Sequence, residues 1–265
     1  MQAQQRKVSL SSGELSYYVA GEGRPLVYLH PAGGVHWTPV LEGLSKSFAL
    51  HVPVVPGFDG TNAHDSVKSM PALARLIGEF IDRVVGRGCD VIGCSFGGYL
   101  ALWLASERAE LVDHLVLECP AGFRAKGAGE RPADIAALHK VLYLHPEKLA
   151  GHSKPAELLA ANRKMMASYG AAPDTDEELL GRLSSIDKLT LILHGTADRL
   201  VPKESAQLLK SRLPRSYLVY VWDAAHAIEV DQPERILSVL ADFLERSEGF
   251  MVNWGTLALD AGAGT

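Results

Sequence analysis

The chain has 265 residues, a length that fits one large α/β domain or a domain carrying an insertion. Its net charge of −5 and pI near 6.1 give no electrostatic footprint for binding nucleic acid. No stretch approaches the ~20 uninterrupted apolar residues of a membrane helix. The charged N-terminus is not followed by an apolar segment, so we expect no secretory signal and a cytoplasmic protein.

The first elements of the chain are strands and one helix. Residues 7–19 alternate between apolar and polar and predict a hairpin. Leu26–His30 and Phe48–Val52 are short apolar runs, typical of strands buried on both faces of a sheet. An amphipathic helix follows, with Ser69 as the expected N-cap and Gly86 beyond its end.

The stretch from Asp90 to Leu100 carries the pattern G-x-S-x-G. It runs from a β-branched apolar segment through Gly93-Cys-Ser95-Phe-Gly97 into an Ala/Leu-rich segment. Strand, sharp turn and helix in this order form the context of a nucleophile elbow. The serine of an elbow lies in a strained turn, where glycines lack the Cβ that would clash with neighbouring chain. The pattern therefore predicts that the Ser95 hydroxyl is raised above the end of a strand.

The three cysteines, Cys89, Cys94 and Cys119, lack the spacing of metal ligands. All three fall in or beside predicted buried strands, so we interpret them as reduced core residues. A functional thiol at Cys94, next to Ser95, is left open.

After a predicted strand at 111–119 the regular alternation of strands and helices stops. Residues 121–185 have helical patterns and no convincing strand, and we predict that they form a helical lid inserted into the domain. The core then consists of residues 1–120 and 186–248. The weakly patterned tail, 249–265, is frayed or docks through its apolar residues Phe250, Met251 and Trp254.

Strand–helix order resumes beyond the predicted lid. Leu189–Leu193 and Tyr217–Trp222 are expected strands, with a helix over Pro202–Leu213 between them. A last helix is expected to start at Asp231 as N-cap, with Glu234 completing a capping box.

The predicted lid has helical patterns around residues 135–149, 155–166 and 177–183. Lys and Arg outnumber Asp and Glu eight to four over 121–172, which would suit an acidic substrate, but acidic residues follow directly and favour a solvated face. An apolar stripe on a helix more often packs in the core than contacts a substrate. The candidates for contacting a substrate are nevertheless the apolar residues of the predicted lid and one glycine of the loop after Leu26–His30: Gly33, Phe123, Leu138, Leu142, Tyr143, Met165, Met166 and Tyr169.

Three polar motifs follow predicted strands, at the sheet edge where sites of parallel α/β sheets form. Ser95 follows one strand. Asp198 follows the predicted strand Leu189–Leu193, in the segment His194-Gly-Thr-Ala-Asp-Arg-Leu-Val-Pro202. His226 follows the last predicted strand, Tyr217–Trp222. Serine, acid and histidine in this chain order form one of the known orders of the catalytic triad.

With these motifs the chain resembles the α/β-hydrolase superfamily, in its lidded branch of esterases, lactonases and related hydrolases, over roughly residues 15–245. The resemblance implies a mostly parallel eight-stranded sheet with helices on both faces. It also implies Ser95 as nucleophile, His226 as general base and later acid, and Asp198 as the residue that orients His226. Glu118, at the end of the strand after the elbow helix, is the alternative acid.

Acyl transfer also needs N–H donors for the oxyanion of the tetrahedral intermediate. The resemblance implies the N–H of Phe96 as the first donor. The loop that supplies the second usually begins His-Gly, but here it reads His30-Pro31-Ala32-Gly33. Because proline has no N–H, we expect Ala32 as the second donor, with Gly33 as the alternative. His30 is interpreted as a residue that shapes the loop.

The resemblance implies a serine hydrolase of carboxylic esters, lactones or thioesters that works through an acyl-enzyme, with no cofactor and no metal. A small-molecule substrate is the only partner expected, and the chain is expected to be a monomer or homodimer. One alternative is a C–C bond hydrolase of vinylogous diketones. That group typically has Trp after the histidine and Asn before the serine, where this chain has Ala227 and Cys94. A non-catalytic small-molecule receptor on the same fold is a second alternative.

Overall fold

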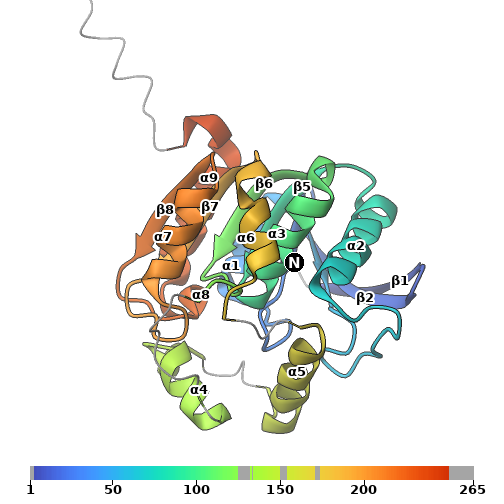
Figure 1. Ribbon diagram of the computed structural model, residues 1–265, viewed down its shortest axis with the longest axis horizontal. Coiled ribbons are helices and arrows are strands. Elements are labelled where there is room, and N and C mark those ends of the chain that lie inside the picture. Colours follow the sequence, from blue (N-terminus) through green and yellow to red (C-terminus); the bar gives the residue numbers. More distant parts are fainter. Residues whose placement is uncertain (1–2, 125–131, 133, 150–153, 171–173, 251–265) are drawn as a thin grey trace, which may run out of the picture.

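The computed structural model describes residues 3–124, 132, 134–149, 154–170 and 174–250. Eight strands form one sheet in the order β1-β2-β4-β3-β5-β6-β7-β8 (Figure 1). β1–β2 and β2–β4 pair antiparallel, and every other pair is parallel, which confirms the mostly parallel sheet. The strands are β1 (Gln4–Leu10), β2 (Gly13–Ala20), β3 (Arg24–Leu29), β4 (Phe48–Pro53), β5 (Cys89–Cys94), β6 (Val112–Glu118), β7 (Leu189–Gly195) and β8 (Ser216–Val221).

Helices cover both faces of the sheet, and each face has its own apolar core. α2, α3, α6 and α7 pack on one face, whereas α1 and α9 pack on the other. Every residue of β5 and β7 is buried, as expected for central strands covered on both sides. The helices are α1 (Pro39–Leu44), α2 (Met70–Phe80), α3 (Phe96–Glu107), α4 (Ile135–Leu142), α5 (Ala156–Ser168), α6 (Glu177–Arg182), α7 (Lys203–Arg212), α8 (Ile228–Asp231) and α9 (Pro233–Arg246).

The sequence predicted both ends of the helix that includes α2, but it did not predict the short helix α1. The Ser69 side chain accepts a hydrogen bond from the Ala72 N–H and caps α2 as expected. α2 continues into a π-helical turn, Ile81–Val85, and Gly86 ends it with a φ of 75°. The short helix α1 was not predicted, because its six residues are too few to show a helical period.

The predicted N-cap role of Asp231 is wrong. The N-cap position of α9 is occupied by Gln232, without a capping side-chain bond. The Asp231 side chain turns inward and accepts hydrogen bonds from the N–H groups of Ala225 (2.7 Å), Leu144 (3.1 Å) and His145 (2.8 Å). A buried carboxylate is stabilised by three such bonds, and it ties the residues after α4 to the loop that follows β8.

Within residues 121–185 the helices lie in two places. α4 and α5 lie apart from the helices that cover the sheet (Figure 1). α6 packs beside α3, and Leu179 and Leu183 are buried in the core of that face. Of the described helices in this segment, α6 therefore belongs to the layer that covers the sheet, whereas α4 and α5 do not.

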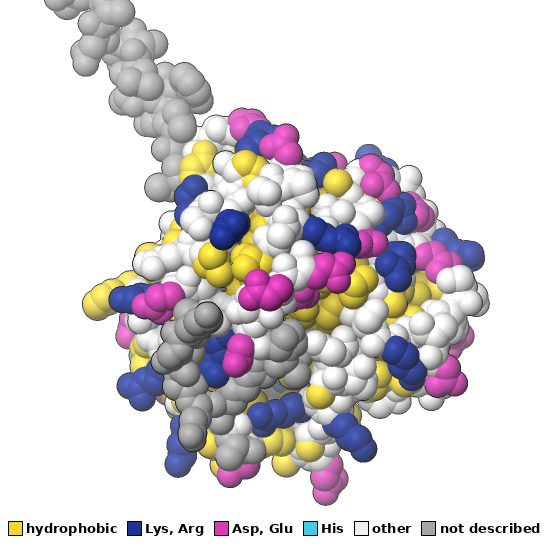
Figure 2. Space-filling view, viewed as in Figure 1, with side chains coloured by type: hydrophobic (Ala, Val, Ile, Leu, Met, Phe, Trp, Pro, Cys, Tyr) yellow, Lys and Arg dark blue, Asp and Glu magenta, His cyan; other side chains and the backbone are white. Residues whose placement is uncertain are grey.

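The end of the described chain packs on the sheet. Phe250 is buried, and its ring lies 5.3 Å from those of Tyr217 and Phe243. This confirms the docked alternative for Phe250, whereas Met251 and Trp254 lie outside the described residues. In the described part of the chain no helix is both long and apolar enough to cross a membrane. Basic and acidic side chains are interspersed over the face seen in Figure 2.

Candidate active site

Ser95 lies in the turn between β5 and α3, with φ 52° and ψ −108°. This left-handed conformation is strained for a residue with a side chain. The flanking glycines are required by close packing. A Cβ on Gly97 would overlap the carbonyl oxygen of Leu29, and a Cβ on Gly93 would overlap that of Gly97. The predicted strand, turn and helix are therefore confirmed.

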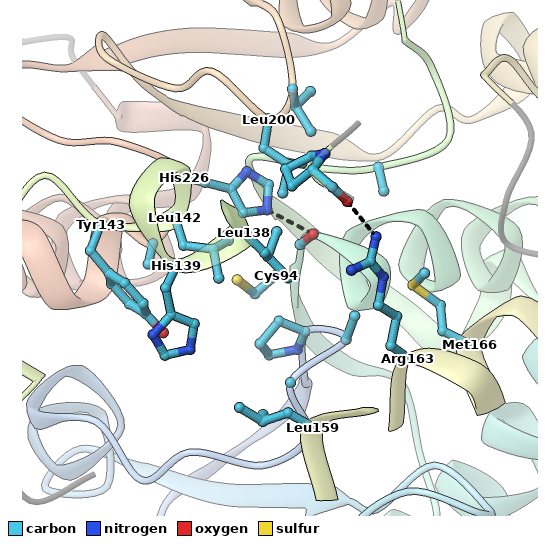
Figure 3. A pocket seen from close by; sticks show the side chains of 18 of the residues that line it. Cys94, Leu138, His139, Leu142, Tyr143, Leu159, Arg163, Met166, Leu200 and His226 are labelled. Atoms are coloured by element: carbon cyan, nitrogen blue, oxygen red, sulfur yellow. Dashed lines mark hydrogen bonds between the residues drawn. The ribbon is translucent and has the colours of Figure 1, made fainter. Parts of the chain in front are cut away.

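A chain of hydrogen bonds joins the three residues that the sequence singled out. The Ser95 Oγ lies 2.8 Å from His226 Nε2, drawn as a dashed line in Figure 3, and His226 Nδ1 lies 2.8 Å from Asp198 Oδ2. Ser95 follows β5, Asp198 follows β7 and His226 follows β8, so parallel strands bring the three to one edge of the sheet.

The Asp198 carboxylate is held in place and kept charged. Its Oδ1 accepts hydrogen bonds from the N–H groups of Leu200 (2.8 Å) and Val201 (2.9 Å), which leaves Oδ2 for His226. Burial acts to raise the pKa of Asp198, but the neighbouring His226, then His194 and the hydrogen bond from the Val201 N–H, bring it below the ordinary value. An ionised carboxylate at Nδ1 fixes the histidine tautomer in which Nε2 is free to take the serine proton.

Glu118, the alternative acid, does not take this position. Its side chain is fully buried next to Glu229, and burial together with that second carboxyl raises its pKa well above the ordinary value. Glu118 contributes to the elbow through its backbone, whose carbonyl accepts the Ser95 N–H at 2.8 Å.

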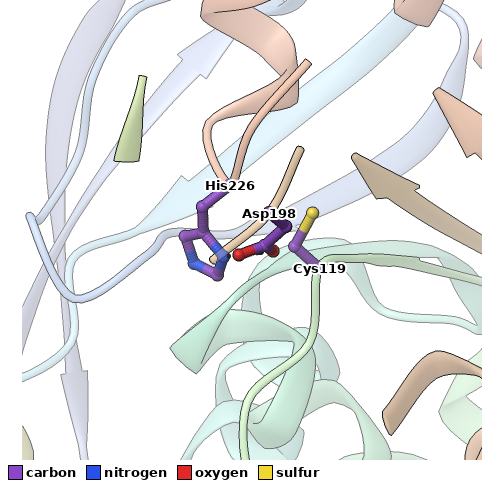
Figure 4. Close-up of side chains that lie close together, drawn as sticks. All are labelled: Cys119, Asp198 and His226. Atoms are coloured by element: carbon purple, nitrogen blue, oxygen red, sulfur yellow. Dashed lines mark hydrogen bonds and ion pairs between the residues drawn. The ribbon is translucent and has the colours of Figure 1, made fainter. Parts of the chain in front are cut away.

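Cys119, Asp198 and His226 lie close together, as Figure 4 shows, with one potential ligand atom from each within 4.8 Å of the others. These donors are committed elsewhere, because the His226 Nδ1 and the Asp198 carboxylate bind each other. Burial raises the pKa of the Cys119 thiol well above its ordinary value, whereas a metal requires the thiolate. These side chains fit the series of hydrogen bonds from Ser95 to Asp198 and do not fit a metal site.

The expected oxyanion donors flank the serine. Phe96 is the first residue of α3, where a helix leaves its N–H groups without intrahelical partners. Ala32 and Gly33 line the same cavity as Ser95. They lie in a turn closed by the hydrogen bond from the Gly34 N–H to the Pro31 carbonyl, 2.9 Å.

His30 supports this turn from below, as the sequence predicted. Its Nε2 accepts the Val55 N–H at 3.0 Å, and its Nδ1 lies 2.8 Å from the Pro31 carbonyl oxygen. The ring is fully buried, and burial lowers the pKa of His30 to about 4. The neutral imidazole therefore bridges the start of the loop and the segment after β4.

A cavity of about 250 Å³ opens over Ser95 and His226 (Figure 3). Most of the predicted substrate-contacting residues line it: Gly33, Phe123, Leu138, Leu142, Tyr143 and Met166. Several lining residues were not predicted, because their distance along the chain hides their common position: Ile135, His139, Leu149, Leu159, Leu200 and Val201.

Met165 and Tyr169 do not line the cavity, so the prediction for these two is corrected. The Tyr169 hydroxyl donates to the Pro56 carbonyl at 2.7 Å, and its ring is buried in the core. Met165 packs against Gly57. Both residues anchor α5 to the segment that follows β4.

The cations of the predicted lid are not all solvated. Arg124, Lys154 and Arg163 line the cavity together with one acid, Asp174. The solvated-face interpretation is therefore wrong for these three, because the chain folds α4, α5 and the segment after β6 around the cavity.

A second cavity of about 430 Å³ adjoins the first. The two cavities share lining residues at their junction: Pro31, His36, Cys94, Tyr143, Leu149 and Ala227. The wall of the second cavity includes the buried polar residues Thr38 and Glu229, whose side chains share a hydrogen bond of 3.0 Å. The cavity over Ser95 therefore continues into a second one, past Cys94 and Tyr143.

With the elbow and the hydrogen-bonded chain in place, comparison with known proteins decides the family. The sequence model of the Alpha/beta hydrolase family matches residues 26–239. The chain belongs to this family. Its curated relatives include a pimeloyl-(acyl-carrier protein) methyl ester esterase of Aeromonas hydrophila, 27% identical, with 84% of this chain and 96% of that protein covered.

Another curated relative of this α/β hydrolase is named for a different substrate. A 2-hydroxymuconate semialdehyde hydrolase of a Pseudomonas species is 24% identical, with 94% of this chain and 96% of that protein covered. Among solved structures, a thermophilic esterase from Thermogutta terrifontis is similar in fold, with a TM-score of 0.74, 23% identity, and coverage of 93% of this chain and 99% of that chain. The chain is thus an enzyme of the serine hydrolase class, and its relatives include both methyl ester esterases and a semialdehyde hydrolase.

Proposed function

We propose that this α/β hydrolase cleaves a carboxylic ester, lactone or thioester through an acyl-enzyme. The observation that carries the proposal is the unbroken chain from the Ser95 hydroxyl through His226 to Asp198, at the floor of a largely apolar cavity. In this proposal α4 and α5 act as the lid that covers the substrate.

The three hydrogen-bonded residues have distinct roles in the proposed reaction. The Ser95 Oγ attacks the carbonyl carbon while His226 Nε2 takes its proton, and Asp198 stabilises the imidazolium that forms. The N–H groups of Phe96 and Ala32 stabilise the oxyanion. His226 then protonates the leaving alcohol or thiol. A water molecule, activated by the same histidine, hydrolyses the acyl-enzyme and frees Ser95.

Hydrolysis of a C–C bond on the same three residues is the second candidate, favoured by the similarity to 2-hydroxymuconate semialdehyde hydrolase. The residues beside the triad argue against it. Ala227 and Cys94 stand where that group typically has a tryptophan and an asparagine. The Ala227 N–H donates to the Leu142 carbonyl at 2.8 Å, so the backbone after His226 is bound to the predicted lid.

A substrate panel tests the proposal: short and long p-nitrophenyl esters, lactones, thioesters and a vinylogous diketone, with kcat/KM for each. Ester, lactone or thioester turnover well above that of the diketone is expected. Ser95→Ala should lower kcat by about 10⁴-fold or more without changing the circular dichroism spectrum. Turnover of the diketone alone would favour the second candidate, and no turnover in the whole panel would favour a receptor.

A further inference from the structure

Asn162 is the one fully buried residue of α5. A buried amide needs partners for both its oxygen and its N–H groups. The Asn162 Nδ2 donates to the Gly33 carbonyl (3.0 Å) and to Asp59 Oδ1 (3.0 Å), and its Oδ1 accepts the Asp59 N–H (2.9 Å). These three bonds join α5 to two segments of the core that lie more than 100 residues earlier in the chain.

Asp59 also binds the loop after β3 that contains Gly33, at Val35. Its Oδ2 accepts the Val35 N–H at 2.8 Å, and its Oδ1 accepts Lys154 Nζ at 2.5 Å. Burial acts to raise the pKa of Asp59, but hydrogen bonds from Lys154 and Asn162 hold it below the ordinary value, so the carboxylate is ionised. Its backbone has a φ of 52°, a strained conformation that these contacts maintain.

Near its start this loop is also held by the bond from the Gly34 N–H to the Pro31 carbonyl and by His30. It contains no helix or strand from His30 to Thr38. Gly34 has a φ of 85°, and a Cβ on it would overlap Asp59 Oδ1, so the loop lies tightly against the carboxylate. The loop is therefore held by Asn162 at Gly33 and by Asp59 at Val35, directly after the expected oxyanion donor Ala32.

We propose that Asn162 and Asp59 are positioning residues that hold the Ala32 N–H in the oxyanion hole, so that docking of α5 completes this hole. The inference rests on the proposed ester hydrolysis. It makes α5 more than a cover over the substrate. When α5 leaves its place, the Gly33 carbonyl and Asp59 lose the Asn162 amide. The residue after Ala32 is then no longer held from α5, and the Ala32 N–H can turn away from the reacting carbonyl.

The test compares Asn162→Ala with Lys164→Ala, a control at an exposed position of the same helix. Three quantities are measured with a p-nitrophenyl ester: kcat, KM and the inhibition constant of a trifluoromethyl ketone, which forms an oxyanion on the serine. Because removal of one oxyanion donor costs about 10²–10³-fold in kcat, its displacement in Asn162→Ala should cost about 10–100-fold. KM should stay within about twofold, and inhibition by the ketone should weaken in parallel with kcat. Lys164→Ala should match the wild type.

A purely structural role of Asn162 would give a different pattern. The inference is overturned if kcat and ketone inhibition in folded Asn162→Ala equal those of the wild type. It is also overturned if KM rises, and inhibition by the product acid weakens, by the same factor by which kcat falls. Where a thermal melt shows that Asn162→Ala does not fold, Lys154→Met, which removes the ion pair with Asp59, is judged by kcat and by ketone inhibition, with a smaller expected loss; unchanged values would overturn the inference. Failure of the proposed function is distinguishable, because the wild type itself would then not hydrolyse the ester.

Discussion

The Ser95 hydroxyl oxygen lies 2.8 Å from Nε2 of His226, a residue 131 positions later in the chain. The contact depends on the path of the loop that carries His226. β5 and β8 are separated in the sheet by β6 and β7, and the loop after β8 must reach back across both. That loop is held by Asp231 through the Ala225 N–H and by the bond between Ala227 and Leu142. The candidate base is thus positioned by contacts outside the triad itself.

Asp198→Asn should lower kcat about 10⁴-fold while leaving the fold intact. The amide would donate to His226 Nδ1 and force the tautomer in which Nε2 carries the proton, so that it cannot accept one from Ser95. Steady-state kinetics with a p-nitrophenyl ester, alongside a thermal melt, would measure this. Glu118→Gln is the matched control. Because burial and the neighbouring Glu229 raise the pKa of Glu118 and so favour its neutral form, the neutral amide should preserve activity. Equal losses in the two variants would contradict the assignment of the acid.

Most of the fold could be predicted, because it depends on patterns among residues that are close in sequence. The apolar runs of β3, β5 and β7 and the G-x-S-x-G turn are local patterns, and a largely parallel sheet follows from the alternation of strands with helices. Asp198 and His226 could be placed because each directly follows a strand of a parallel sheet. What depends on the packing of distant segments could not be predicted. Asp231 has the local signature of a helix cap, yet the inward turn of α8 gives it three backbone donors.

The same limit applies to the predicted lid. Met165 and Met166 are adjacent in sequence, and only the way α5 docks decides that Met166 lines the cavity while Met165 packs on Gly57. Asn162 gave no signal at all, because a lone asparagine in a helix has no pattern that reveals its burial. A buried polar residue of this kind is found only when its partners, Gly33 and Asp59, are brought beside it.

His30 should make the protein less stable as the pH falls from about 6.5 to about 4. Its pKa is about 4 in the folded chain and near 6.5 in the unfolded chain, so over this range only the unfolded state takes up the proton. The loss amounts to about 3 kcal/mol at most. Urea unfolding at several pH values measures it. His30→Asn should be less stable at pH 7 but should show a shallower decline over this range. An unchanged slope would mean that His30 is not buried in its neutral form.

Asp231→Ala should destabilise the fold by about 3 kcal/mol, since it leaves three backbone N–H groups without their acceptor: that of Ala225 in a buried bond and those of Leu144 and His145 in partly buried ones. kcat should fall as well, because Ala225 directly precedes His226. Asp231→Asn keeps one oxygen acceptor and should lose less of both. Urea unfolding and ester kinetics on the two variants test this. A stable and fully active Asp231→Ala would show that the contacts of Asp231 do not position the histidine loop.

The cysteines should be unreactive in the folded protein. Burial raises the pKa of Cys89 to about 12 and that of Cys94 well above its ordinary value, so both remain thiols at pH 8. Iodoacetamide at this pH should leave ester turnover unchanged. After unfolding in guanidinium, Ellman's reagent should detect three thiols. Time-dependent loss of activity with alkylation of Cys94 would instead indicate a functional thiol beside the nucleophile.

The most direct test of the central claim is covalent labelling with a fluorophosphonate, followed by intact mass and peptide mass spectrometry. The probe reacts only with a serine whose proton is removed as it attacks. The wild type should gain one phosphonyl group, located on Ser95. Ser95→Ala should gain none, and His226→Ala should react far more slowly. A label on another residue, or equal labelling of wild type and Ser95→Ala, would contradict the assignment of Ser95 as the nucleophile.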